Sequence, residues 1–117
     1  MGSNTILNKS FLFAIKIVNL YMKLINEKKE YVLSKQLLRA GTSIGANTKE
    51  GVHASSKPEF KCKLGIAFKE AKETEYWLEL MVATHILSKE ESKEALKDCD
   101  ELCRILSSII KTCNNTN

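Results

Sequence analysis

The sequence predicts an all-α protein: one domain, residues 1–117, that folds as an up-down-up-down antiparallel four-helix bundle and assembles as a homo-oligomer. A length of 117 residues with 44% hydrophobic and 27% charged residues suits a single globular core. One proline and five glycines leave little sequence for loops, and the period of two that is typical of strands is missing. Apolar residues instead repeat at intervals of four and three. This spacing predicts four helices, over about residues 9–26, 31–55, 57–87 and 89–113.

The first predicted helix, residues 9–26, is apolar on two sides. One stripe, expected to face the core, comprises Phe11, Ile15, Val18, Met22 and Ile25. A second line, which a helix with one buried side does not need, comprises Phe13, Ile17, Leu20 and Leu24. Because exposed apolar patches of that extent usually mark interfaces, we expect the second line to contact another subunit. The alternative is a helix enclosed on both sides by its own bundle.

The second predicted helix, residues 31–55, carries small residues where another helix would pack. Its seam consists of Leu37, Gly41, Ile44, Thr48 and Gly51. Glycine in a helix interior costs about 1 kcal/mol relative to alanine, so we expect a neighbouring helix to approach closely here.

Beside this seam runs a polar ladder, formed by Arg39, Ser43, Asn47 and Glu50. In one interpretation the ladder is a structural network, in which Arg39 pairs with Glu70 or Glu73 of the next helix. In the other it is an exposed recognition face. We favour the structural network, because the small residues alongside would bring the next helix close enough to shield the ladder.

The third and fourth predicted helices have clear start signals. Ser56 followed by Pro58 and Glu59 is typical of a helix N-terminus, and Ser88 with Glu91 forms a capping box. The third helix has an inward line of Phe60, Leu64, Ala67, Ala71, Thr74, Leu78, Met81 and His85. Trp77 lies off this line, and we expect it at the oligomer interface. The seam of the fourth helix is Ala95, Cys99, Leu102, Leu106, Ile109 and Cys113.

The cysteines and the chain start favour a cytoplasmic protein. The spacing of the four cysteines matches no zinc pattern, so we expect reduced, buried thiols at Cys62, Cys99, Cys103 and Cys113. No signal peptide is recognisable at the start, and no apolar run approaches the roughly 18 residues that span a bilayer.

The sequence offers little for catalysis. With two histidines and no glycine-rich phosphate loop, the sequence lacks the groups that acyl transfer and phosphoryl transfer need. We therefore expect no enzyme, no catalytic residue and no cofactor. Glu50 and His53 form half of the Glu-x-x-His signature of di-iron bundles, but the second half is missing, since Val82 stands three residues before His85. A di-metal carboxylate bundle is therefore a remote alternative, and we expect no metal site.

Basic residues outnumber acidic ones, 18 to 14, which gives a formal charge of +4. Such an excess permits contact with nucleic acid without demanding it. An oligomer multiplies a weak basic stripe, and phosphate binding grows with the number of neutralised contacts. Any contact would be to the backbone and nonspecific, because aromatic residues are few. The candidate nucleic-acid-binding residues are Lys9, Lys16, Lys23, Lys28, Lys29, Lys35, Lys57 and Lys61.

The motifs SIGANTKEG, residues 43–51, and IAFKEAKETEYWLEL, residues 66–80, resemble those of four-helix-bundle proteins encoded in intervening sequences of bacterial 23S ribosomal RNA genes. The resemblance extends over about residues 10–111. It implies an antiparallel bundle, a ring-like homopentamer and no accepted catalytic residues; a relative, the accessory protein of diversity-generating retroelements, engages nucleic acid and a reverse transcriptase. Lys49 departs from the alanine often found there. Positions typical of the family are matched by Arg39, Ser43, Asn47, Glu50 and Glu73.

Two hypotheses follow for function. The first is a non-enzymatic, homo-oligomeric bundle that binds RNA or DNA weakly and without sequence preference, as an accessory to another protein. The second is a protein–protein interaction scaffold, in which the extra apolar faces make the contacts and the lysines keep the assembly soluble. We do not expect the protein to bind a membrane.

Overall fold

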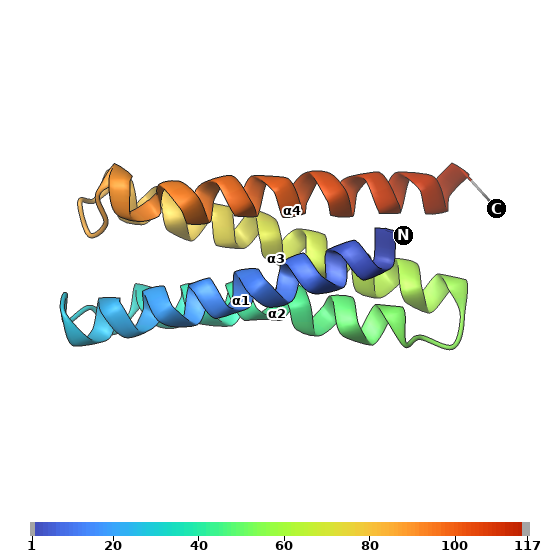
Figure 1. Cartoon of the computed structure of the whole chain (residues 1–117), viewed down its shortest axis with the longest axis horizontal. Helices are drawn as coiled ribbons and strands as arrows, with labels where there is room; N and C mark the ends of the chain where they lie inside the picture. The colour runs from blue at the N-terminus through green and yellow to red at the C-terminus, as the bar shows by residue number, and fades with distance from the viewer. Residues whose placement is uncertain (1, 116–117) are drawn as a thin grey trace.

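Four helices make up the part of the chain that the computed structural model describes, residues 2–115. Their bounds are α1 Gly2–Asn26, α2 Leu33–Val52, α3 Lys57–Ala83 and α4 Lys89–Asn115. They lie side by side in a rod of 48 × 20 × 20 Å, in which each helix packs against the next and α1 also packs against α4 (Figure 1). Within residues 2–115, no helix is both long enough and apolar enough to cross a membrane.

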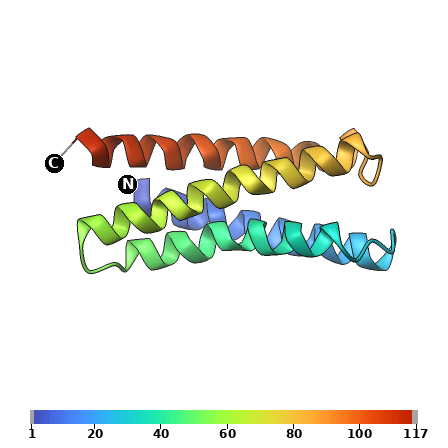
Figure 2. The ribbon, with the colours of Figure 1, turned by 180° about the vertical axis from the view of Figure 1, so that it is seen from behind.

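The connections between helices gather at the two ends of the rod. The α1–α2 and α3–α4 connections lie at one end, and the α2–α3 connection lies at the other, together with the start of α1 and the end of α4 (Figures 1 and 2). Residues near the α1–α2 turn are therefore far from residues near the α2–α3 turn, a separation that matters for the basic residues described below.

Three helix ends differ from the predicted ones by three residues or more. α1 begins at Gly2 rather than near residue 9, because no residue in that stretch interrupts the helix. The stretch was not predicted as helix because its mostly polar residues show no apolar repeat. α2 ends at Val52 and α3 at Ala83, three and four residues earlier than expected. His85, expected on the inward line of α3, lies beyond the end of the helix with a φ of 64° and is exposed.

The start signals predicted for α3 and α4 are confirmed. The Ser56 hydroxyl accepts a hydrogen bond from the Glu59 N–H at 3.2 Å. At α4 the bonds are reciprocal: Ser88 Oγ accepts from the Glu91 N–H at 3.1 Å, and Glu91 Oε1 accepts from the Ser88 N–H at 2.8 Å. Two orphan backbone donors are thereby satisfied at the start of α4.

The start of α2 is held by an acid that the sequence did not reveal as a cap. Glu30 accepts hydrogen bonds from the N–H groups of Val32, Leu33 and Ser34, the last at 2.7 Å. Burial raises the pKa of Glu30, but these N–H groups together outweigh burial and hold the pKa below its ordinary value. The negative charge also suits the positive end of the helix.

The small-residue seam of α2 does bring neighbouring helices close. Leu37, Gly41, Ile44, Thr48 and Gly51 are all buried. A Cβ added at Gly41 would lie 2.8 Å from both Cγ atoms of Ile17 on α1, and one at Gly51 would lie 2.5 Å from Leu64 on α3. Backbone thus packs directly against side chains of both neighbours, as predicted.

The inward faces of α3 and α4 complete the core. The predicted line of α3 is buried from Leu64 to Met81, and on α4 the buried residues are Ser92, Ala95, Cys99, Leu102, Cys103 and Leu106. Among the thiols, Cys62 contradicts the expectation of burial, because it is exposed near the start of α3. Ile109 and Cys113, near the end of α4, are half-buried.

Candidate interaction surfaces

The two apolar faces of α1 are the reverse of the predicted ones. Phe13, Ile17 and Leu24, expected at an interface between subunits, are at most 2% exposed and belong to the core of the chain itself. Leu20 is half-buried and packs against the same core. The reason is that Ile17 fits against Gly41 of α2, where a larger residue would exclude it.

The stripe that was expected to face inward forms the outer face of α1. Four of its five members are exposed: Phe11 by 66%, Ile15 by 45%, Val18 by 41% and Met22 by 46%, whereas Ile25 is half-buried. The four-three spacing places them along one side of the helix, opposite Phe13 and Ile17. We call these four residues the outer apolar face. Its length and continuity distinguish it from the single apolar residues that are normal on protein surfaces.

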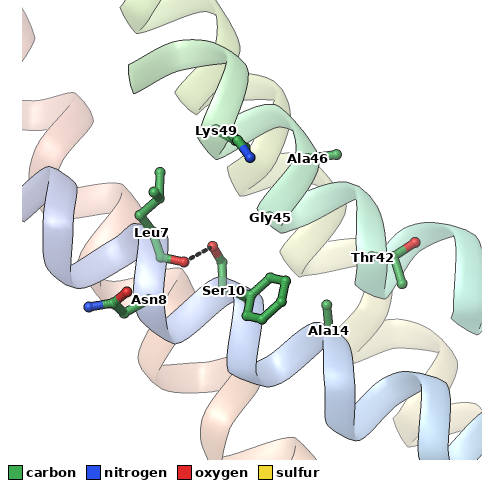
Figure 3. A pocket seen from close by; sticks show the side chains of 9 residues that line it. Leu7, Asn8, Ser10, Ala14, Thr42, Gly45, Ala46 and Lys49 are labelled. Carbon is green, nitrogen blue, oxygen red and sulfur yellow. Dashed lines mark hydrogen bonds between the residues drawn. The ribbon is translucent and has the colours of Figure 1, made fainter. Parts of the chain in front are cut away.

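A groove between α1 and α2 lies beside the outer apolar face. It has a volume of about 420 Å³, and its lining includes Ser10 and Ala14 of α1 with Thr42, Gly45 and Ala46 of α2 (Figure 3). A Cβ at Gly45 would lie 3.3 Å from the Ser10 carbonyl oxygen, so the floor of the groove is helix backbone. The Ser10 hydroxyl donates to the Leu7 carbonyl at 3.2 Å, which leaves the lining mostly apolar.

Four of the eight candidate nucleic-acid-binding lysines are ion-paired with α4. Lys16 Nζ lies 2.9 Å from Glu94 and 2.5 Å from Asp98, and the carboxylates raise its pKa. The remaining pairs are Lys9 with Glu101 at 3.2 Å, Lys23 with Glu91 at 2.9 Å and Lys28 with Glu91 at 3.0 Å. These lysines join α1 and the turn after it to α4, and each has an acid of the chain as its partner.

The other four candidates do not form one surface. Lys29 and Lys35 lie near the α1–α2 turn, whereas Lys57 and Lys61 lie at the start of α3, at the opposite end of the rod (Figure 1). All four are exposed, and within residues 2–115 none of them has an ion pair. The sequence could not show this separation, because it depends on which turn lies at which end.

The polar ladder makes the cross-helix pair that the structural interpretation predicted. Arg39 on α2 contacts Glu70 at 3.2 Å and also pairs with Glu73, both on α3. The Trp77 indole N–H donates to Glu73 at 2.9 Å, so Trp77 is tied to this network. Trp77, expected at an oligomer interface, is half-buried, packs against the core and makes an edge contact with Tyr76 at 5.1 Å.

The rest of the ladder bonds mainly within α2. Ser43 Oγ donates to the Arg39 carbonyl at 2.6 Å, and the Asn47 amide donates to the Ser43 carbonyl at 2.9 Å. Glu50 pairs with Lys63 of α3 at 2.9 Å. Among residues 2–115, neither Ser43 nor Asn47 hydrogen-bonds to a neighbouring helix. The Arg39 side chain is 48% exposed, so the ladder is only partly shielded.

The half-signature for a di-metal site is not assembled. His53 is the exposed C-cap residue of α2, and Glu50 is engaged with Lys63. Within residues 2–115, His, Cys, Asp and Glu side chains do not cluster in threes at a distance suited to a metal ion.

The comparisons with known proteins agree in family. The model of the 23S rRNA-intervening sequence protein family matches residues 3–108. A crystal structure from Bacteroides thetaiotaomicron VPI-5482, described as a protein with unknown function from the S23 ribosomal protein family, is 51% identical. The match covers 95% of this chain and 99% of that one, with a TM-score of 0.92. A comparison with curated proteins finds no match.

Proposed function

Because the chain belongs to the 23S rRNA-intervening sequence protein family, we propose that it is a non-enzymatic scaffold whose copies assemble through the outer apolar face of α1. The observation that carries the proposal is the exposure of Phe11, Ile15, Val18 and Met22 along one side of a helix. Burying such a face between copies removes apolar surface from water, the dominant favourable term in most protein association.

The proposed assembly is a homo-oligomer, and the resemblance to the family implies a ring of five. A ring needs a heterologous contact, in which the outer apolar face meets a different surface of the neighbouring copy. The α1–α2 groove supports this arrangement because it adjoins the face at Phe11 and has small residues, among them Ser10, Ala14, Gly45 and Ala46, in its lining. A cavity of about 150 Å³ accommodates a benzene ring. The groove, at about 420 Å³, has room for an apolar side chain of a neighbour.

A pair of variants tests the proposal. Phe11→Gln/Ile15→Gln makes the outer apolar face polar without adding charge, and should reduce the mass of the native particle to that of one chain. Leu12→Gln is the matched control, since Leu12 is 58% exposed but lies about a quarter of a turn from the middle of the face, beside Lys9 and Lys16. Light scattering on a sizing column should show an unchanged mass for the control. If the double variant and the native protein had equal masses, the outer apolar face would be excluded as the surface of assembly.

Weak, sequence-nonspecific nucleic-acid binding is the second candidate function. The net charge of +4 and the exposure of Lys29, Lys35, Lys57 and Lys61 favour it. The ion pairs with α4 reduce the support, because Lys9, Lys16, Lys23 and Lys28 already have acids of the chain as partners. Filter binding of RNA across a salt series tests this candidate: affinity must fall steeply as salt rises if phosphates are bound. No retention at low salt would leave the scaffold as the function.

A further inference from the structure

A row of cations runs along the side of α4 that faces away from α1. It consists of Lys89, Lys93, Lys97, Arg104 and Lys111, and all five are exposed. At 3.6 residues per turn they fall within an arc of about 80°. The first three are spaced by four residues, and the last two follow at intervals of seven, so the row is nearly straight. We call it the α4 basic row.

The charges of α4 are divided between its two sides. The acids Glu91, Glu94, Asp98 and Glu101 point toward α1 and pair with its lysines. On the other side, Lys89, Lys93, Lys97 and Lys111 have no ion pair among residues 2–115. Arg104 pairs with Asp100 at 2.9 Å, but both side chains are more than half exposed, so the pair holds the arginine weakly. Glu90 and Glu101 lie at the margin of the row, and Glu101 is paired with Lys9 of α1.

A shallow groove lies at the C-terminal half of the row. Its volume is about 420 Å³, and its lining includes Lys72 of α3 with Arg104 and Lys111 of α4. Ser107 and Ser108 contribute two hydroxyl groups, which can donate hydrogen bonds. Asp100 is the one acid in the lining, and it is engaged with Arg104. Lys72 is also paired, with Glu75 at 2.9 Å, and its side chain is half exposed, so this pair too holds the cation weakly. The three cations with the two hydroxyl donors suit the oxygens of a phosphate group.

We propose that the α4 basic row, with this groove, binds the phosphate backbone of a nucleic acid. From Lys89 to Lys111 the helix rises about 33 Å, at 1.5 Å per residue. A straight row of that length suits a polyanion with regularly spaced charges better than a small anion, which one cluster would satisfy. Exposed aromatic residues are absent from the row, so the contact reads backbone and not bases.

This inference deepens the second candidate function by naming its surface, and it is independent of assembly through α1. It also differs from the surface predicted from sequence, since none of the eight candidate lysines belongs to the α4 basic row. The candidate lysines on α1 face an acidic side of α4, and the exposed candidates are divided between the two ends of the rod. The cations on this side of α4 face solvent in one row.

The experiment compares two variants that remove the same charge. Lys93→Gln/Lys97→Gln interrupts the row, and Lys49→Gln/Lys69→Gln removes two exposed lysines elsewhere, on α2 and α3. Lys49 also lines the α1–α2 groove, and the native mass of the control variant shows whether its assembly is unchanged. Each is titrated into a fluorescently labelled oligouridylate of about 30 nucleotides, longer than the row, at about 50 to 200 mM salt. We expect the row variant to bind at least tenfold more weakly and the control less than twofold more weakly. The slope of log affinity against log salt should fall by about 1.4 in the row variant, about 0.7 per lost phosphate contact.

Three results would overturn the inference: equal losses in both variants, no binding by the native chain at about 50 mM salt, or stronger retention by anionic phospholipid vesicles that the row variant alone abolishes. Far-UV circular dichroism confirms that the variants are folded. The native mass of each is measured on the same samples. If the row variant loses binding while its mass is unchanged, the result supports the α4 basic row. If the scaffold proposal is wrong, every sample has the mass of a single chain, and the binding of the two variants can still be compared.

Discussion

Phe11 and Phe13 are two residues apart on α1 and face opposite ways: Phe13 is 2% exposed within the core, whereas Phe11 is 66% exposed on the outer apolar face. Residues two positions apart in a helix are separated by about 200° of rotation, so these two side chains lie on opposite sides of α1. One phenylalanine holds α1 in its own bundle. The other is available to a second copy of the chain.

This relationship predicts different consequences for the two alanine variants. Phe13→Ala removes a buried aromatic side chain and should lower the free energy of unfolding by about 3 to 5 kcal/mol. Phe11→Ala removes no core contact and should act only where copies are associated. Urea unfolding at two protein concentrations about a hundredfold apart measures both, because association makes stability concentration-dependent. A loss in Phe11→Ala that is equal at both concentrations would contradict the assignment of the faces.

Gly41 and Gly65 provide a test of helix packing. A methyl group at Gly41 would meet both Cγ atoms of Ile17, a stiff β-branched residue, so Gly41→Ala should lower the free energy of unfolding by about 1 to 3 kcal/mol. A Cβ added at Gly65 would have no neighbouring atom within 4 Å. Gly65→Ala should therefore raise the free energy of unfolding by up to about 1 kcal/mol, the difference in helix propensity. Thermal unfolding followed by circular dichroism checks the signs. Stabilisation by both substitutions would mean that α1 and α2 are farther apart than described.

Acid sensitivity should depend on Glu91. The Ser88 N–H, Lys23 and Lys28 lower the pKa of Glu91 from 4.5 to about 2 in the folded chain. Between these values the unfolded chain binds more protons, so the stability contributed by Glu91 is present above pH 4.5 and lost as the pH falls toward 2. Glu91→Gln keeps an oxygen for the capping box but removes the charge.

The stability of the Glu91→Gln variant should therefore differ most from that of the native chain above pH 4.5 and converge with it toward pH 2. Urea midpoints over a pH series give the comparison. A gap that stays constant across this range would show that the carboxylate does not keep these partners.

The thiols should differ in reactivity. Cys62 is exposed, whereas the Cys99 thiol is buried and donates to the Ala71 carbonyl at 3.2 Å. The neighbouring Cys103 thiol and burial raise the pKa of Cys99, which disfavours its reactive thiolate. In the native protein a thiol-reactive reagent should modify Cys62 rapidly and Cys99 only after unfolding, as peptide mass spectrometry would show. Cys62→Ser should remove the rapid phase, and rapid modification of Cys99 would argue against its packing.

The parts of the fold that were predictable from sequence are those with local causes. Ser56 and Ser88 mark helix starts because their bonds are made within one turn. The seam of α2 was also recognisable, since glycine at Gly41 and Gly51 makes sense only where another helix packs closely. Glu30 escaped notice because glutamate is not a usual capping residue, although it stands just before the apolar period of α2 begins.

The faces of α1 were not predictable from periodicity, because both stripes have the same spacing and similar residues. Their environment distinguishes them: Lys16 and Lys23 lie beside the Phe13 stripe, and α4 carries Asp98 and Glu91 at matching intervals. Comparing the charge spacing of two helices could have identified the stripe that faces inward. The α4 basic row needed the structure, because a lysine is available only when no acid of another helix reaches it.

The most direct measurement is the mass of the native chain in solution, by sedimentation velocity over about a hundredfold range of concentration. One chain has a mass of 13.2 kDa. Assembly through the outer apolar face predicts a discrete multiple of that mass, fivefold for the ring that the family resemblance implies. A particle of 13.2 kDa at every concentration, with Phe11 and Ile15 left in water, would contradict the account.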